Sequence, residues 1–276
     1  MRYIKEFLLA RSLDLAEGTI YQYRLELKNL PVYLEKPTIE ATTNDLRGYL
    51  NQFKGKSINT IGRKISTLKA FYSWLINEDE YNLEKNPMKK IKNPKEAVLV
   101  PKALSRDDFD RLRFHPKNIR NQAIIELLVA SGMRISEMIN LNRNNLDMNL
   151  RRIKVLGKGN KERIVHFSAI AKFCLIQYFK TRTDNNPALF INKYGNRLSI
   201  RAIEQQIKAY GINAGLRAKV TPHVMRHTFA TNLYKRGADL GFIQDELGHA
   251  RPDTTKRYAV LDEQTKMDMY DRYAVI

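Results

Sequence analysis

The chain has 276 residues, of which 48 are lysine or arginine and 29 are aspartate or glutamate, so its formal net charge is +19. This length suits one large domain or two modest ones, and the charge favours a polyanionic partner such as nucleic acid, because each neutralised phosphate releases counterions. Cys174 is the single cysteine, which excludes an internal disulfide and any cysteine-based zinc site.

The positive charge is spread along the whole chain. Residues 1–102 carry 18 basic and 12 acidic side chains, a net +6, and residues 103–276 carry 30 and 17, a net +13. We therefore expect both halves to contact the polyanion. The amino-terminal residues 1–12 are amphipathic, and their apolar run is too short for a signal peptide or a membrane span. The expectation is a soluble, cytoplasmic protein.

Residues 1–94 show apolar positions at helical spacing and few strand signals. Thr42 and Asp45 form a capping box in front of a helix over Leu46–Phe53. A longer helix follows Ser57, and its inner face comprises Ile61, Ile65, Leu68, Tyr72 and Leu75. We expect four helices in this part of the chain.

Basic side chains gather beside this longer helix and lie largely off its apolar face. An ordinary solvated helix face would look the same, but the charge of the chain favours contact with DNA phosphates. The candidates for this contact are Lys54, Lys56, Arg63, Lys64 and Lys69.

The segment Asn86–Ser105 combines three prolines with five lysines and has little periodicity. It predicts an interdomain linker, placed at 95–103, between a domain over 1–94 and a domain over 104–276. Such a linker would let two domains close around a duplex. The lysines expected along the DNA backbone here are Lys89, Lys90 and Lys92.

The second domain begins with a helix capped by Ser105 and Asp108, followed by an apolar helix over 121–131. Arg134 comes next, after a Ser-Gly break, and Glu137 stands three residues further on. Taken alone, the pair is consistent with a surface helix ion pair worth about 0.3 kcal/mol.

Two β-like runs within 151–167 flank a Gly-Lys-Gly-Asn-Lys turn, which predicts a hairpin. Lys158 lies in the turn between two glycines that allow a close backbone approach, although an isolated turn lysine is usually only solvated. Lys161 and Arg163 of the same hairpin are further candidates for DNA contact. Helices are expected near 169–180 and 200–214.

The stretch Thr221–Tyr258 places polar groups inside an apolar helical pattern. His223 and Arg226 are three residues apart and share one helix face, and His249 and Tyr258 follow. Each alone is weak evidence, since a single histidine or tyrosine is more often a core residue. A metal site that uses His223, His227 and His249 is disfavoured because no carboxylate cluster stands at ligand spacing.

Together, these segments resemble the tyrosine recombinase (phage integrase) family in order and spacing. The similar segments are SGMRISEM, LGKGNKER, TPHVMRHTFAT and LGHARPDTTKRY. The resemblance covers essentially the whole chain and is greatest to the compact Xer-type group. It implies a mainly α fold, with an amino-terminal SAM-like core-binding domain and a mostly α catalytic domain that contains a small β element.

The resemblance also implies roles for individual residues and a reaction without metal, cofactor or ATP. Tyr258 would be the nucleophile, Arg134 and Arg226 would bind the phosphate oxygens, and Lys158 would protonate the leaving oxygen. His223 would act as a general base or acid, His249 would hydrogen-bond the phosphate, and Glu137 would orient the site.

The partners implied are double-stranded DNA with inverted-repeat core sites and a homo-tetramer on two such sites, from a monomer or weak oligomer without DNA. A second recombinase or an accessory protein is a further candidate partner. Strand exchange would pass through a Holliday junction, in dimer resolution or in integration and excision. Type IB topoisomerase activity and a non-catalytic DNA-binding role are the alternatives. The tail at 259–276 has an apolar face that would dock in cis or on a neighbouring protomer.

Overall fold

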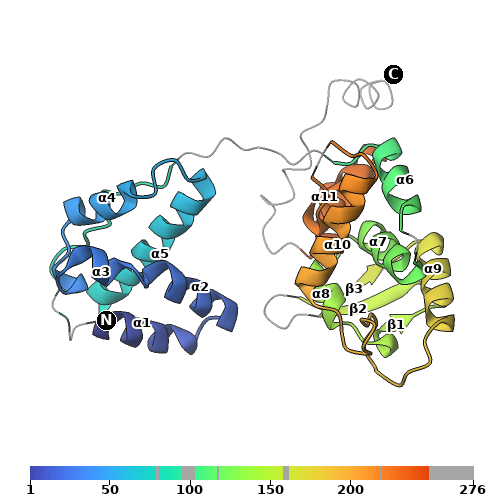
Figure 1. Cartoon of the computed structure of the whole chain (residues 1–276), viewed down its shortest axis with the longest axis horizontal. Coiled ribbons are helices and arrows are strands. Elements are labelled where there is room, and N and C mark those ends of the chain that lie inside the picture. The colour runs from blue at the N-terminus through green and yellow to red at the C-terminus, as the bar shows by residue number, and fades with distance from the viewer. Residues whose placement is uncertain are drawn as a thin grey trace. The chain divides into compact units, whose positions relative to one another are not determined.

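The computed structural model describes residues 1–78, 81, 83–94, 103–116, 118–157, 162–217 and 219–248. The chain divides into two units, Met1–Leu99 and Val100–Ile276, which are labelled by element in Figure 1. The predicted linker at 95–103 lies largely outside the described residues and stays a prediction. Among the described helices, none combines the length and apolar character needed to cross a membrane.

The described part of the first unit is helical. Its elements are α1 (Arg2–Ser12), α2 (Glu17–Leu27), α3 (Leu30–Leu34), a 3₁₀ turn over Thr38–Glu40, α4 (Thr43–Asn51) and α5 (Ile58–Asn77). The predicted capping box is confirmed, because Thr42 and Asp45 exchange hydrogen bonds at the start of α4. Ser57 caps α5 by accepting from the Thr60 N–H. The short helix α3 was not predicted.

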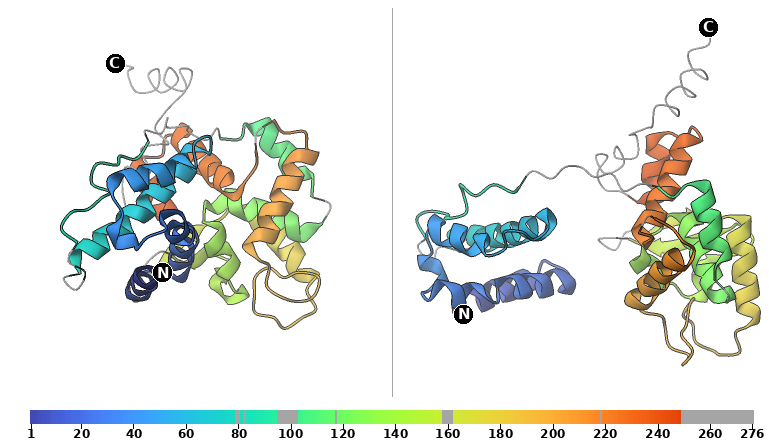
Figure 2. Two further views of the ribbon diagram at one scale, coloured as in Figure 1. Left: turned by 60° about the vertical axis from the view of Figure 1, so that its left-hand side comes forward. Right: turned by 45° about the horizontal axis from the view of Figure 1, so that its top comes forward.

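The core of the first unit forms around α5, which packs against α1, α2 and α4. In Figure 2 the dark-blue α1 lies alongside the lighter helices of this unit. The rings of Phe7 and Phe71 meet at 5.4 Å between centroids, and the Tyr72 hydroxyl donates to the Thr38 carbonyl at 2.8 Å. Burial of aromatic rings at these positions stabilises the bundle by removing apolar surface from water.

The second unit contains helices and a small sheet in its described part. Its elements are α6 (Arg106–Phe114), α7 (Ile119–Ser131), α8 (Ile135–Asn140), a 3₁₀ turn over Arg143–Asn145, β1 (Leu146–Asp147), β2 (Arg152–Leu156), β3 (Glu162–His166), α9 (Ala169–Lys180), α10 (Ile200–Asn213), α11 (Pro222–Lys235) and α12 (Leu240–Leu247). The buried helix α7 packs against α6, α9, α11 and β3. The predicted fold class, mainly α with a small β element, is confirmed.

The predicted hairpin is formed by β2 and β3, which pair in antiparallel fashion from Arg152 opposite His166 to Leu156 opposite Glu162. The strand β1 adds to the other edge of β2. Ile153 and Val155 are buried, which matches the two-residue period of a strand with one face on the core. The turn at 158–161, with Lys158 and Lys161, lies outside the described residues.

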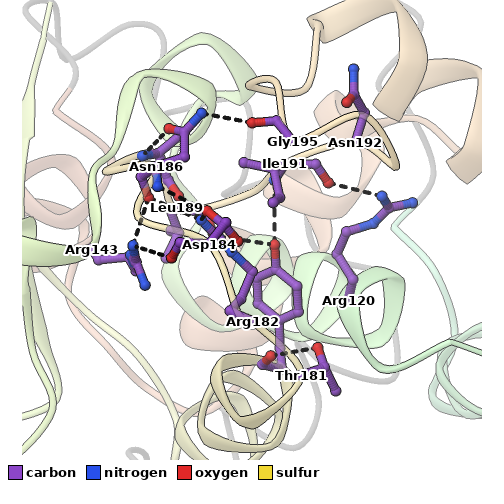
Figure 3. Close-up of polar contacts among 12 residues, drawn as sticks. Arg120, Arg143, Thr181, Arg182, Asp184, Asn186, Leu189, Ile191, Asn192 and Gly195 are labelled. Atoms are coloured by element: carbon purple, nitrogen blue, oxygen red, sulfur yellow. Dashed lines mark hydrogen bonds and ion pairs between the residues drawn. The ribbon is translucent and has the colours of Figure 1, made fainter.

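Arginines fix the loop between α9 and α10, as Figure 3 shows. Arg182 binds Asp184 through two nitrogens, at 2.5 and 2.6 Å, and this bond holds the pKa of the Asp184 carboxyl well below its usual range. Arg143 donates to the carbonyls of Asp184 and Asn186. Because Arg197 donates to the Leu141 carbonyl at 2.7 Å, the same loop also fixes the end of α8.

Candidate active site

Arg134 stands at the amino end of α8, directly after a tight reversal of the chain. Helix α7 ends at Ser131 and is capped by Gly132, whose φ of +58° is a left-handed conformation that favours glycine. The Arg134 backbone N–H donates to Glu137 at 2.8 Å, and its Nη1 donates to the same carboxylate at 2.9 Å. The predicted pairing of Arg134 with Glu137 is therefore present, and it sets both the start of α8 and the direction of the guanidinium.

Arg226 lies on α11 and is buried. Its Nη1 donates to the Gly132 carbonyl at 2.7 Å, and its Nη2 donates to the Leu247 carbonyl at 2.8 Å. One planar fork thus joins the end of α7 to the end of α12. A lysine has a single nitrogen and could not hold both carbonyls in this geometry.

Glu137 is the buried acid of the site, and it serves two arginines. Arg163, on β3, donates through Nη1 and Nη2 to its two carboxylate oxygens, each at 2.9 Å. Burial raises the pKa of the Glu137 carboxyl, but the hydrogen bonds from Arg163 and from the Arg134 backbone outweigh it, and the net pKa is lowered. Glu137 therefore stays ionised between two cations.

At the carboxyl end of α12, three consecutive backbone carbonyls each accept a hydrogen bond from an arginine guanidinium. Arg163 reaches Glu246 O at 3.4 Å, Arg226 reaches Leu247 O at 2.8 Å, and Arg134 reaches Gly248 O at 3.3 Å. These are carbonyls of the last turn, where a helix lacks internal donors and attracts positive charge. Arg134 and Arg226 are therefore brought together at two adjacent residues, Leu247 and Gly248, which come just before His249 in the sequence.

His223 lies one helical turn before Arg226 on α11 and is exposed, whereas His227 is buried. Burial, together with the nearby His223, lowers the pKa of His227. His227 is therefore an interior residue of α11. His249 and Tyr258 lie outside the described residues, so the structure brings together Arg134, Glu137 and Arg226 of the predicted site, with His223 on the same helix as Arg226.

Comparison with known proteins agrees with this geometry. The sequence profile of the phage integrase family matches residues 102–265, and that of the phage integrase SAM-like N-terminal domain matches residues 2–79. The chain belongs to the phage integrase family. Its members are the tyrosine recombinases, and the chain is accordingly an enzyme of site-specific DNA recombination.

Relatives named as Xer proteins match this recombinase over nearly its whole length. Tyrosine recombinase XerD of Oceanobacillus iheyensis is 36% identical over 277 residues, covering 94% of this chain and 93% of that protein. Tyrosine recombinase XerC of Histophilus somni is 32% identical over 272 residues, covering 94% and 92%. The crystal structure of XerA recombinase is 31% identical, covers 100% of this chain and 99% of its own, and superposes with a TM-score of 0.60.

A further solved structure shows the same fold at low identity. It is the XerH site-specific recombinase bound to its difH substrate in a pre-cleavage complex, at 21% identity and a TM-score of 0.78, covering 97% of this chain and 94% of that one. The predicted resemblance to the tyrosine recombinase family is confirmed.

The basic residues predicted for the first unit of this recombinase differ in their surroundings. Lys54, Lys56, Lys89, Lys90 and Lys92 are exposed, and Lys69 is half-buried. Lys64 is less available for DNA contact than the sequence predicted. Its ammonium lies 2.6 Å from the buried Glu26 carboxylate and over the Phe53 ring. Arg63 donates to the same carboxylate at 2.7 Å. DNA contact by these residues stays a prediction.

Sequence reasoning missed three partners in the structure. They are Glu26, which binds Arg63 and Lys64; Arg163, which binds Glu137; and Glu246, whose Oε1 lies 2.9 Å from His166 Nδ1. The sequence held one sign that Glu26 is buried, since it stands next to Leu27, an apolar position of α2. In the part of the chain that the structure describes, no group of three or more potential metal ligands gathers.

Proposed function

We propose that Tyr258 cuts one DNA strand by attacking its scissile phosphate. The phenolic oxygen forms a bond to phosphorus while the bond from phosphorus to the 5′-oxygen breaks, which leaves a 3′-phosphotyrosyl enzyme and a free 5′-hydroxyl. A 5′-hydroxyl from the partner duplex then attacks this ester and releases the tyrosine. Each phosphoester formed replaces one broken, so the reaction needs no ATP.

The observation that carries this proposal is the convergence of Arg134 and Arg226 on the carboxyl end of α12. Two planar guanidinium groups at one point suit the non-bridging oxygens of a single phosphate, whose negative charge grows during the attack. The carbonyls of Leu247 and Gly248 accept hydrogen bonds from these groups in the structure. A bound phosphate, with its full negative charge, would compete with those carbonyls for the same donors.

The remaining roles rest on residues of the sequence pattern. Lys158, in the hairpin turn, is proposed to give its proton to the leaving 5′-oxygen. His223 is proposed as a general base or acid near Tyr258, and His249 as a donor to the phosphate. Glu137 touches Arg134 and therefore orients it without contacting the reacting atoms.

The proposed substrate is double-stranded DNA with inverted-repeat core sites, and the proposed assembly is a homo-tetramer on two sites that resolves through a Holliday junction. The net charge of +19 supports the polyanionic partner. Dimer resolution and integration or excision of a mobile element are both consistent with this chemistry, with or without a second recombinase or an accessory protein. The place of action would be the cytoplasm, on the nucleoid.

A groove of about 730 Å³ in the second unit supports a proposal on how the protomers of this tetramer contact one another. Its lining includes Phe109, Val129, Phe229, Leu233 and Phe242. The tail at 259–276 carries apolar residues near helical spacing, and we propose that it docks in this groove on a neighbouring protomer. Removal of 263–276, or Phe242→Glu, should abolish tetramer formation on DNA. Unchanged assembly would contradict docking in trans.

Two alternatives are separated by the reaction products. Type IB topoisomerase activity would relax supercoiled plasmid without joining strands from different duplexes. A non-catalytic accessory protein would bind DNA and cut nothing. The presence in sequence of every expected catalytic residue favours recombination over the accessory role.

The first test compares the wild-type protein with Tyr258→Phe on nicked duplexes taken from inverted repeats beside its own gene. A protein–DNA band that survives boiling in detergent is expected with the wild type and not with the variant. A band with both proteins would exclude Tyr258 as the nucleophile. Binding by the wild type without any cutting, on sites that support assembly, would favour the accessory role.

A further inference from the structure

Arg163 has a place in the fold that differs from that of a DNA-contacting side chain. It lies on β3, two residues after the hairpin turn, and only 14% of its side chain is exposed. Each of its three guanidinium nitrogens has a protein acceptor, namely the two Glu137 oxygens and the Glu246 carbonyl. The sequence had made it a candidate for DNA contact, whereas these contacts direct its donors inward.

The Glu137 carboxylate joins Arg163 to Arg134. It accepts two bonds from Arg163 at 2.9 Å and two from Arg134, at 2.8 Å from the backbone N–H and 2.9 Å from Nη1. Four bonds use the ordinary acceptor capacity of a carboxylate. Because only 4% of the Glu137 side chain is exposed, water has little access with which to replace a lost partner.

Arg163 also lies against the point where the chain leaves α12. A Cβ atom built on Gly248 would lie 2.8 Å from Arg163 Nε and 2.9 Å from its Cζ, and Gly248 has a φ of +62°. The backbone therefore reaches this close to the guanidinium only because the residue is glycine. Arg163 thus contacts both Glu137, which binds Arg134, and Gly248, where the segment that continues to Tyr258 begins.

We propose that Arg163 is a positioning residue for strand cleavage, which orients the guanidinium of Arg134 through the shared Glu137 carboxylate. This inference rests on the proposed function, because Arg134 must bind the scissile phosphate for its orientation to matter. The charge of Arg163 is not sufficient for this role. Its planar fork, which binds both oxygens at once, sets the rotation of the carboxylate.

The test substitutes Arg163→Lys, which keeps the charge and removes the fork. Arg182→Lys is the matched control, because Arg182 makes a comparable two-nitrogen pair with Asp184 in the loop drawn in Figure 3. The measured quantities are the rate of covalent complex formation at saturating nicked duplex, the Kd for that duplex, and the thermal unfolding midpoint. Both variants are expected to unfold at a lower temperature than the wild type.

The proposal predicts that Arg163→Lys cuts about 100-fold more slowly, the order of loss expected from a small misplacement of a catalytic group. Its Kd and the salt dependence of that Kd should equal those of the wild type. Arg182→Lys should cut at the wild-type rate when folded. A Kd raised about tenfold or more would instead indicate that the Arg163 fork binds a phosphate itself, and would overturn the proposal.

Two modified substrates identify the group through which Arg163 acts. A methylphosphonate at the scissile position removes the charge that Arg134 neutralises, so the loss in Arg163→Lys should shrink to a few-fold. A sulfur in place of the leaving 5′-oxygen needs no proton from Lys158, so it should leave the loss unchanged. If the sulfur substrate restores the cutting rate of Arg163→Lys and the methylphosphonate substrate does not, Arg163 acts through Lys158 of the hairpin. That result would overturn the proposal.

A second variant protects the test against simple misfolding. Glu137→Gln should slow cutting as Arg163→Lys does, and the double variant should be no slower than either, because both changes break one connection. Additive losses would contradict the shared route. A wild-type protein that forms no covalent complex defeats the proposed function and this inference together, whereas an active wild type with an equally active Arg163→Lys defeats this inference alone.

Discussion

The guanidinium of Arg226 donates to the carbonyl oxygen of Leu247 at 2.8 Å, so the arginine of α11 holds the end of the helix that leads to His249. The same side chain holds Gly132 O, two residues before Arg134. Arg226 is therefore both a candidate phosphate ligand and the connection between the two segments that carry the rest of the site.

Substitution of Arg226 by lysine tests both roles. Arg226→Lys should slow covalent complex formation by about 100- to 1,000-fold, the usual loss when one preorganised donor to a transition-state oxyanion is removed. Arg111→Lys is the control, because Arg111 forms an exposed pair with Asp108. The measurement is single-turnover cutting of a nicked duplex. A variant that cuts as fast as the wild type would remove Arg226 from the phosphate site.

The tight turn of the chain at Gly132, just before Arg134, predicts that a larger residue there lowers the stability of the fold. In Gly132→Ala the added Cβ would lie 2.2 Å from Phe229 Cδ1, at a φ of +58°. Left-handed strain and overpacking together should lower the free energy of unfolding by about 2 to 4 kcal/mol, measured by urea titration.

Gly195→Ala is the matched control for this change. Gly195 has a φ of +79°, but its added Cβ would meet nothing within 4 Å. It should therefore show only the conformational cost, about 1 to 2 kcal/mol. Equal losses in the two variants would show that the contact with Phe229 relaxes freely.

The lowered pKa of Glu137 predicts a loss of stability in acid. In the unfolded chain this carboxyl titrates near its ordinary value of 4.5, so its contribution is complete above that pH and is lost as the pH falls through the lower folded value. Urea titrations between pH 6 and pH 3 should show a steeper loss for the wild type than for Glu137→Gln. Parallel curves would mean that the pKa of Glu137 is the same folded and unfolded.

Glu26 predicts a change in DNA affinity that arises inside the first unit. Its carboxylate pairs with both Arg63 and Lys64, so Glu26→Gln should add one unit of positive charge beside these two candidates for DNA contact. The Kd for duplex DNA at low salt should fall, and the salt slope should steepen by about one. The unfolding free energy should drop by about 1 to 3 kcal/mol, because the half-buried Lys64 loses its partner.

Glu17→Gln provides the comparison, since it makes the same charge change at an exposed position on the same helix. It should alter the Kd much less. If both variants tighten binding equally, the effect comes from net charge, and the side of α5 that carries Arg63 and Lys64 does not face DNA.

The sequence by itself determined the family, the helical composition and the local starts of several elements. Thr42, Ser57 and Ser105 cap helices where the pattern predicted, because a cap needs only residues three positions apart. The hairpin over 152–166 follows equally from local alternation and its turn. The sequence motifs around Arg134, Arg226 and Tyr258 are local patterns as well, so they can be recognised without the structure.

Only the tertiary structure decided which charged groups meet. Glu26 meets Arg63 and Lys64 across 37 and 38 residues, and Glu137 meets Arg163 across 26. A lysine or arginine has the same sequence signature whether it faces solvent or a buried carboxylate. The difference depends on how helices and strands distant in the chain pack together, and that packing determines whether a positive charge is available to DNA or positions the arginine beside it.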